Sequence, residues 1–276
     1  MKRLIPKDLR VDVIVTSPPY NINKEYGSYK DNRERQEYKD WLFRMAKLSL
    51  PILKDSGSFF LNVGGIPSDP MFPFEVVSKF IDAGYRLQNI IHWVKSISIE
   101  KEDVGKSNGK QHEDFSIGHF KPIVSERYLT DIQEYVFHLT KTGNIKLNKR
   151  AIGVPYQDKS NIGRWKSAHE DRRDRGNVWF VTYPTINESR HHPAVFPEKL
   201  PFLCIKLHGV RNDMIVYDPF MGTGSTALAC IRLGVNYIGT EIDSDYIRFA
   251  NNEIEKRKKG AIDSWLDNND KRMIFE

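Results

Sequence analysis

The 276-residue sequence contains only two cysteines, Cys204 and Cys230, which are too few for a disulfide scaffold. Its cysteines and eight histidines form no cluster with the spacing of a zinc site. No apolar run is long enough to span a membrane, and residues 1–15 lack the apolar stretch of a signal peptide. These absences predict a soluble, cytoplasmic protein that requires no metal.

Charge is plentiful, and its positive excess lies in one part of the chain. The formal net charge is +6, and hydrophobic residues make up 39% of the sequence, enough for one large domain with a small inserted module. The window Lys141–Arg175 has ten Lys/Arg and four Asp/Glu, an excess equal to that of the whole chain. Tyr156 and Trp165 lie among these cations. This pattern suits a nucleic acid, and an ordinary solvated loop is the alternative.

A short string near the N-terminus carries the strongest signal. Residues 11–15 are an apolar run that predicts a buried strand, and this strand must end before Pro18-Pro19, which cannot continue a sheet ladder. The resulting turn is rigid and rich in free carbonyl groups. It has the Ser17 hydroxyl before it and the Tyr20 ring after it. Such a site suits a planar ligand that carries an amino group, such as a nucleobase.

A second motif lies near the C-terminus and predicts a βαβ unit for an adenosine-type cofactor. Its parts are a strand (215–220), a turn with Gly222 and Gly224, a helix that stops near Gly234, a second strand (236–240) and Glu241. The glycines let the backbone approach a ligand, and the carboxylate can accept both ribose hydroxyls. Taken alone, Gly222-x-Gly224-x-x-Ala227 also fits the fingerprint of a nicotinamide or flavin enzyme.

Together these motifs resemble those of one enzyme family. Thr16-Ser17-Pro18-Pro19-Tyr20-Asn21 resembles the catalytic motif of DNA methyltransferases that modify cytosine N4 or adenine N6. Asp218-Pro219-Phe220-x-Gly222-x-Gly224 resembles the S-adenosylmethionine motif of the same enzymes, and His192–Leu200 resembles their cofactor-proximal motif. The order, with the catalytic motif first and a basic region between the two, resembles the permuted β arrangement of the family.

The resemblance spans about Val11 to Asn252 and implies a fold. We expect an α/β, doubly wound, mostly parallel Rossmann-like sheet of seven strands with an inserted target-recognition region. Residues 1–140 would form the catalytic half of the methyltransferase domain, 141–190 the basic target-recognition region and 191–276 the cofactor-binding half. The pattern predicts helices at 37–50 and 74–83, a helix starting at Pro197, and strands at 57–64, 85–94 and 134–139. Residues 95–122 show no period and are expected to form a loop over the active site or along DNA.

The resemblance also implies roles for individual residues. Ser17 and the Pro18 carbonyl would hold the hydrogens of the target amino group while Tyr20 stacks on a flipped base. The implied catalytic residues are Ser17, Pro18, Pro19 and Tyr20. The implied cofactor-binding residues are Thr16, Phe196, Pro197, Asp218, Phe220, Gly222, Gly224, Ser225 and Glu241. The implied DNA-binding residues are Arg164, Lys166, Arg172, Arg173 and Arg175. Cys204 and Cys230 are assigned to core packing, which excludes the cysteine nucleophile that methylation at cytosine carbon 5 needs.

The serine form of the motif favours cytosine N4 as the acceptor, with adenine N6 as the alternative. An RNA methyltransferase, a nicotinamide enzyme or an inactive DNA-binding module are remote alternatives. The implied cofactor is S-adenosylmethionine and the implied partner is double-stranded DNA, in a restriction–modification system with a cognate restriction endonuclease. The protein would be a monomer or a homodimer. Many relatives carry a strand with Gly-Asp before the catalytic strand, and this element is either absent here or lost by shortening.

Overall fold

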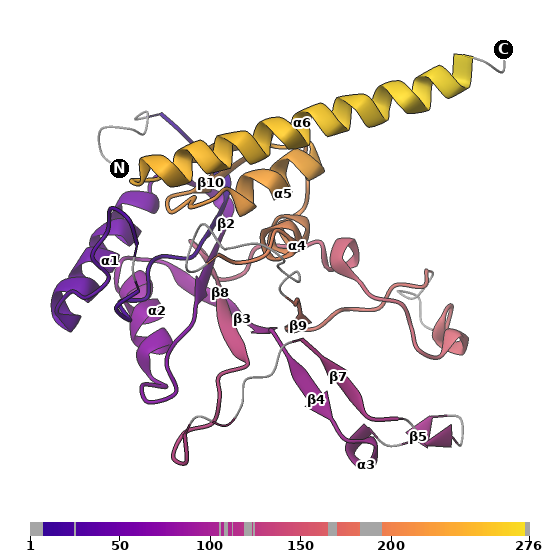
Figure 1. The fold of residues 1–276 in the computed structure, drawn as a ribbon, viewed down its shortest axis with the longest axis horizontal. Helices are drawn as coiled ribbons and strands as arrows, with labels where there is room; N and C mark the ends of the chain where they lie inside the picture. The colour runs from indigo at the N-terminus through magenta and orange to yellow at the C-terminus, as the bar shows by residue number, and fades with distance from the viewer. Residues whose placement is uncertain are drawn as a thin grey trace.

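The computed structural model of the 276-residue chain describes residues 8–24, 26–104, 106–107, 110–111, 113–118, 123, 125–164, 170–182 and 195–273. The centre of the molecule is one seven-stranded sheet of order β11-β10-β1-β2-β8-β3-β9 (Figure 1). Its strands are β1 (Val11–Thr16), β2 (Leu53–Val63), β3 (Arg86–Val94), β8 (Gln133–Thr140), β9 (Val178–Phe180), β10 (Ile215–Asp218) and β11 (Asn236–Gly239). Only β8 runs antiparallel to its two neighbours. The predicted seven-stranded, mostly parallel sheet is confirmed.

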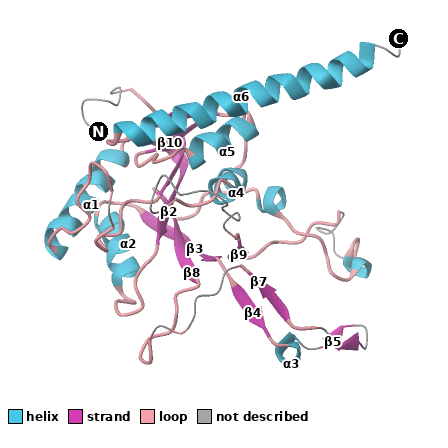
Figure 2. Cartoon of the chain, viewed as in Figure 1, coloured by secondary structure: helices cyan, strands magenta, loops and turns pink. Residues whose placement is uncertain are grey.

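Helices cover both faces of this sheet (Figure 2). Helices α1 (Arg35–Ser49) and α2 (Phe72–Asp82) pack on one face, and α4 (Lys199–His208) and α5 (Ser225–Leu233) pack on the other. Helix α6 (Ser244–Met273) packs against α5, and its C-terminal part extends beyond the body of the molecule. None of the helices among the described residues is long and apolar enough to cross a membrane.

Strand β1 shows why an apolar run predicted a buried strand. All six of its residues are buried. Val11 and Ile14 pack with α1 and α2, whereas Val13 and Val15 pack with α4 and α5. The register of β1 shifts between Val11 and Val13, which breaks the strict alternation of faces. A parallel strand buried on both faces needs apolar side chains at successive positions, so the sequence shows a run instead of an alternating pattern.

Several predicted boundaries were wrong. Strand β2 begins at Leu53, four residues before the predicted strand, because Leu53 pairs with Val11 and is buried although a polar stretch follows it. Helix α2 begins at Phe72 with a proline in its first turn, and α4 begins at Lys199, two residues after Pro197. Glycine ends α5 as predicted, with Gly234 in the left-handed conformation.

Residues 95–118 are more regular than the predicted loop. The strands β4 (Ile97–Ile99) and β7 (Phe115–Ile117) pair antiparallel and form an arm that projects from the sheet. The remaining short elements are α3 (Lys101–Val104), β5 (Lys106–Ser107), β6 (Lys110–Gln111), η1 (Lys149–Ile152) and η2 (Lys159–Asn161). Strand β9, from the predicted target-recognition region, pairs with β3 and becomes the edge of the central sheet.

Candidate active site

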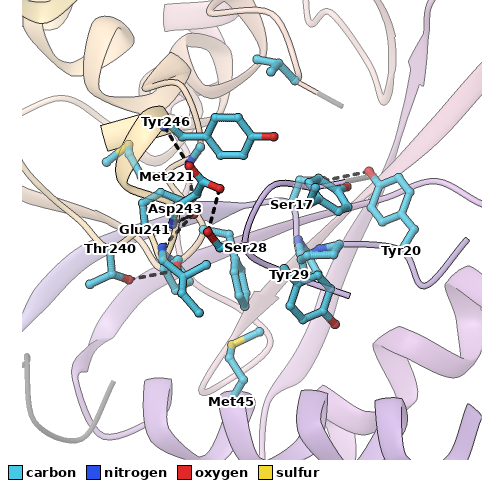
Figure 3. Close-up of a pocket in the computed structure, with 18 of the residues that line it drawn as sticks. Ser17, Tyr20, Ser28, Tyr29, Met45, Met221, Thr240, Glu241, Asp243 and Tyr246 are labelled. Atoms are coloured by element: carbon cyan, nitrogen blue, oxygen red, sulfur yellow. Dashed lines mark hydrogen bonds between the residues drawn. The ribbon is translucent and has the colours of Figure 1, made fainter. Parts of the chain in front are cut away.

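A cavity of about 640 Å³ opens at the carboxyl ends of β1 and β10. These strands are adjacent and parallel, but the chain leaves β1 towards α1 on one face and β10 towards α5 on the other. The two connections therefore diverge and leave a crevice, which is where open α/β sheets bind ligands. Figure 3 shows side chains from both halves of the sequence around this space.

The string after β1 forms one wall of the cavity. Ser17, Pro18, Pro19 and Tyr20 all line it. The Ser17 and Tyr20 hydroxyl oxygens lie 2.8 Å apart and share a hydrogen bond (Figure 3). The buried Tyr38 hydroxyl donates to the Pro19 carbonyl at 2.6 Å and fixes the turn from below. The structure thus places the four residues that the catalytic motif indicated around a single space.

Asp218 lies beneath the cavity and connects the two motifs. Its carboxylate accepts hydrogen bonds from the Thr16 hydroxyl and the Thr226 hydroxyl, each at 2.6 Å, and from the Phe220 amide at 3.0 Å. These bonds join β1, β10 and the first turn of α5. Burial of the side chain raises the pKa of Asp218 to about 6, against the stabilising effect of these three donors.

The glycine turn and Glu241 form the opposite wall. Gly222 and Gly224 have φ of 51° and 95°, a region that favours glycine. The Gly222 amide donates to Glu241 Oε2 at 2.8 Å, and Glu241 Oε1 accepts from the Ile242 and Asp243 amides at 2.7 and 3.0 Å. The carboxylate is therefore held rigidly at the tip of β11, with one oxygen engaged by a single donor.

The predicted cofactor residues divide into two groups. Those that line the cavity are Phe196, Phe220, Gly222, Ser225 and Glu241. Those outside its lining are Thr16, Pro197, Asp218 and Gly224. The Ser225 hydroxyl donates to the Phe196 carbonyl at 2.8 Å and so joins the start of α5 to the segment before α4. Residues 192–194 of the cofactor-proximal motif lie outside the described residues.

Sequence reasoning missed an aromatic wall formed by Tyr26, Tyr29 and Trp41. The Trp41 ring lies 5.4 Å from the Phe220 ring and 6.0 Å from the Tyr29 ring, and all of them line the cavity. Trp41 belongs to α1, where its half-buried side chain reaches the cavity. The guanidinium of Arg33 lies over the Tyr29 and Trp41 rings.

The loop that carries these tyrosines is held at both ends. The Asp31 carboxylate accepts from the Asn21, Ile22 and Lys24 amides at 2.8 to 3.1 Å. The Ser28 hydroxyl donates to Asp243 Oδ2 at 3.0 Å, which connects the loop to the start of α6. Three tyrosines within ten residues (20, 26 and 29) are the one signal in the sequence that could have indicated this wall.

A polar network behind Tyr20 was also missed. Its hydroxyl lies 2.9 Å from Glu134 Oε2 and 3.3 Å from Asn62 Oδ1. Lys95 Nζ donates to Glu134 Oε1 at 3.1 Å. Glu134 belongs to β8, whose antiparallel direction brings the start of this strand to the edge of the sheet where the parallel strands end. No local sequence pattern indicates that Glu134 lies next to Tyr20.

The predicted DNA-binding arginines (Arg164, Arg172, Arg173 and Arg175) do not line the cavity. Arg172, Arg173 and Arg175 each donate to a backbone carbonyl, at 3.1, 3.2 and 2.8 Å. Arg172 and Arg173 are exposed, and so is Arg164, whereas Arg175 is half-buried and its pKa is lowered by burial. Lys166 lies outside the described residues.

The two cysteines take no part in the site. Cys204 and Cys230 are buried in α4 and α5 and are absent from the cavity lining. Burial raises the pKa of both thiols, that of Cys230 to about 12, so neither is a ready nucleophile. Within the described part of the chain, no group of three His, Cys, Asp or Glu side chains could hold a metal ion.

The chemistry of the cavity fits a ligand with separate polar and aromatic parts. Its lining includes two arginines (Arg33 and Arg44), two carboxylates (Glu241 and Asp243) and the aromatic wall. S-adenosylmethionine has a carboxylate, a ribose diol and a planar base that match these three features. The residues present therefore fit this cofactor.

Comparisons with known proteins agree with this chemistry. A family model described as DNA methylase matches residues 11–252. The chain is 28% identical over 256 residues to the type II methyltransferase M.BglII of Bacillus subtilis, a match that covers 88% of this chain and 63% of that protein. It is 27% identical over 248 residues to the DNA adenine methyltransferase YhdJ of Escherichia coli (strain K12), covering 86% of this chain and 74% of YhdJ. The match thus spans less than two thirds of M.BglII.

The fold also has solved counterparts. The structure of the PvuII DNA methyltransferase, described as cytosine-N4-specific, matches with a TM-score of 0.61 at 22% identity. The match covers 89% of this chain and 80% of that one. The α/β architecture described above is therefore shared with a known methyltransferase.

Proposed function

The chain belongs to the family of DNA methylases that act on exocyclic amino groups, and on that premise we propose that it methylates cytosine at N4. The methyl donor is S-adenosylmethionine, and the substrate is a cytosine flipped out of duplex DNA within a restriction–modification system. One observation carries this proposal. The string Ser17–Tyr20 lines the same cavity as Gly222 and Glu241, which lie far from it in the sequence.

The donor half of the cavity binds and orients the cofactor. When bound, S-adenosylmethionine supplies an electrophilic methyl group on sulfur. Glu241 accepts the ribose hydroxyls, because one of its oxygens is engaged by only one amide. Trp41 and Phe220 offer apolar faces for the base, and they exclude water from it. This half of the cavity is built from β10, α1 and the turn before α6.

The acceptor half prepares a poor nucleophile. The lone pair of an exocyclic amine is delocalised into its ring, so it must be localised before it can attack. The Ser17 hydroxyl oxygen and the Pro18 carbonyl accept the two amino hydrogens and direct the lone pair towards the donor. Tyr20 stacks on the base and contributes on the order of 1–3 kcal/mol, which offsets part of the cost of base flipping.

The choice of base rests on two points. The motif has serine at position 17, the form that resembles the cytosine-N4 enzymes. The fold matches that of the PvuII enzyme, which is cytosine-N4-specific. Adenine N6 is the second candidate, because YhdJ, a DNA adenine methyltransferase, matches over 86% of this chain.

DNA contacts are proposed for the exposed arginines of the basic window. Arg164, Arg172 and Arg173 are exposed, and a guanidinium can clamp phosphate or read guanine with two hydrogen bonds. Arg175 and Lys166 are proposed as further DNA contacts from their place in the same basic window of the sequence. A cognate restriction endonuclease would be the cellular counterpart of the enzyme.

Incubation of mixed-sequence duplex DNA with the protein and S-adenosylmethionine, followed by nucleoside mass spectrometry, tests the proposal. N4-methylcytosine is the expected product, and mapping the modified sites would give the recognition sequence. N6-methyladenine would replace the base assignment with the second candidate. Absence of both products, with the cofactor bound, would refute methylation of DNA amino groups by this chain.

A further inference from the structure

A chain of hydrogen bonds connects the catalytic serine to a shielded ion pair. Ser17 Oγ lies 2.8 Å from the Tyr20 hydroxyl, which lies 2.9 Å from Glu134 Oε2. The other oxygen of Glu134 accepts from Lys95 Nζ at 3.1 Å. The Glu134 side chain is only 12% exposed and that of Lys95 22%, so solvent screens this pair weakly.

The direction of these bonds follows from the donors and acceptors present. The Tyr20 hydroxyl has one proton, and its neighbours on the inner side are Glu134 Oε2 and Asn62 Oδ1, both acceptors. The Asn62 amide is fixed, because its Nδ2 donates to Glu134 Oε2 and to the Tyr135 carbonyl, both at 3.1 Å. A flipped amide would set its oxygen against a carboxylate and a carbonyl. Tyr20 therefore donates inwards and accepts from Ser17.

This direction determines what Ser17 offers to the cavity. Among the described residues, Tyr20 is the one hydrogen-bond partner of Ser17 Oγ. Because Ser17 donates its hydroxyl proton to Tyr20, Ser17 Oγ has only lone pairs to offer to any other partner. We propose that the Lys95–Glu134 ion pair is a positioning device that commits Ser17 Oγ to accepting hydrogens from the amino group to be methylated. This inference rests on the proposed function.

Close packing around Gly64 supports the device. Gly64 follows the pair Val63–Tyr135 in the ladder between β2 and β8. A Cβ at position 64 would lie 2.9 Å from the Tyr20 ring and 3.0 Å from the Glu134 carboxyl carbon. The lack of a side chain at this position therefore lets the phenol and the carboxylate approach each other.

The negative charge of Glu134 is the critical property. A glutamine at position 134 would fill the same volume, but its NH₂ group can donate to the Tyr20 oxygen. Tyr20 would then be able to donate to Ser17, whose proton would turn into the cavity against the amino hydrogens. Glu134 and Lys95 thus act on the substrate through Tyr20 and Ser17, without contact of their own.

The test compares Glu134→Gln, Tyr20→Phe and the double variant with the wild-type chain on duplex DNA. We expect Glu134→Gln to lower kcat on the order of 100-fold, with unchanged S-adenosylmethionine affinity by calorimetry and an unchanged KM for DNA. The double variant should be no slower than Tyr20→Phe, because Glu134 acts through the hydroxyl that Tyr20→Phe removes. Glu75→Gln is the matched control, since it breaks a surface ion pair with Arg35 and should keep full activity.

Several outcomes would overturn this inference. Full activity of Glu134→Gln, multiplicative losses in the double variant, or a loss confined to cofactor affinity would each do so. If Glu134→Gln fails to fold, two variants of Lys95 provide the test. Lys95→Arg keeps the positive charge and should lose less kcat than Lys95→Met, and equal rates of the two would refute the role of the ion pair. A wild-type chain that binds the cofactor but methylates no DNA would refute both the proposed function and this inference. A wild-type chain and a Glu134→Gln variant that are equally active would refute this inference alone.

Discussion

Asp218 is a buried carboxylate whose ionisation opposes folding. The folded-state pKa is about 6 and the ordinary value is 3.8, so the folded chain holds this proton more tightly than the unfolded chain. The stability from this group is complete below about pH 4 and is lost as the pH rises through about 6, on the order of 3 kcal/mol. The Tm of the wild type minus that of Asp218→Asn should therefore fall between pH 4 and pH 7. A difference that stays constant or rises would contradict the burial argument.

Glu241 makes a separate prediction for the donor. Glu241→Ala removes the proposed ribose acceptor and the partner of the Gly222 amide, so cofactor affinity should fall about 10- to 100-fold. Glu241→Gln keeps the volume and one acceptor oxygen and should lose less. Calorimetric titration with S-adenosylmethionine measures both variants. Equal affinity of Glu241→Ala and the wild type would exclude a ribose contact.

At the scale of elements, the two glycines that flank α5 differ in what a side chain would meet. Gly234 ends the helix at φ 67° with open space around it, so Gly234→Ala should cost about 1 kcal/mol of stability and leave cofactor affinity unchanged. Gly224 has φ 95°, and a Cβ there would lie 3.2 Å from the Ala250 side chain on α6. Gly224→Ala should therefore lower both Tm and cofactor affinity. If Gly224→Ala lowers Tm but leaves cofactor affinity unchanged, the turn does not contribute to cofactor binding.

The elements also show what could be predicted from the sequence. The ends of β1 and β10 carry strong local signals, because Pro18-Pro19 must end a strand and Gly222 and Gly224 must make a turn. Pairing of distant strands then brings the two motifs together. Glu134 carries no such signal, since its position depends on the register of an antiparallel strand more than 70 residues from its partner on β2. The arm at 95–118 was missed because its strands are only three residues long.

For the molecule as a whole, the charge distribution makes a prediction about the proposed binding of DNA. If the basic window contacts phosphates, affinity should fall steeply between low and moderate salt. Arg173→Ala removes an exposed cation of that window and should reduce the salt slope by about one. Arg248→Ala is the matched control, because Arg248 is an exposed arginine on α6 and lies outside the basic window. Equal slopes for both variants, or an affinity that is insensitive to salt, would place the DNA surface elsewhere.

The measurement that bears most directly on the whole molecule is single-turnover transfer of a labelled methyl group from S-adenosylmethionine to duplex DNA. It is made with the wild type and with Ser17→Ala, at saturating cofactor. We expect transfer by the wild type, a loss on the order of 100-fold or more in Ser17→Ala, and equal cofactor affinity in both. Equal transfer by the two proteins, or a Ser17→Ala variant that no longer binds the cofactor, would contradict the assignment of Ser17 to the acceptor half of the cavity.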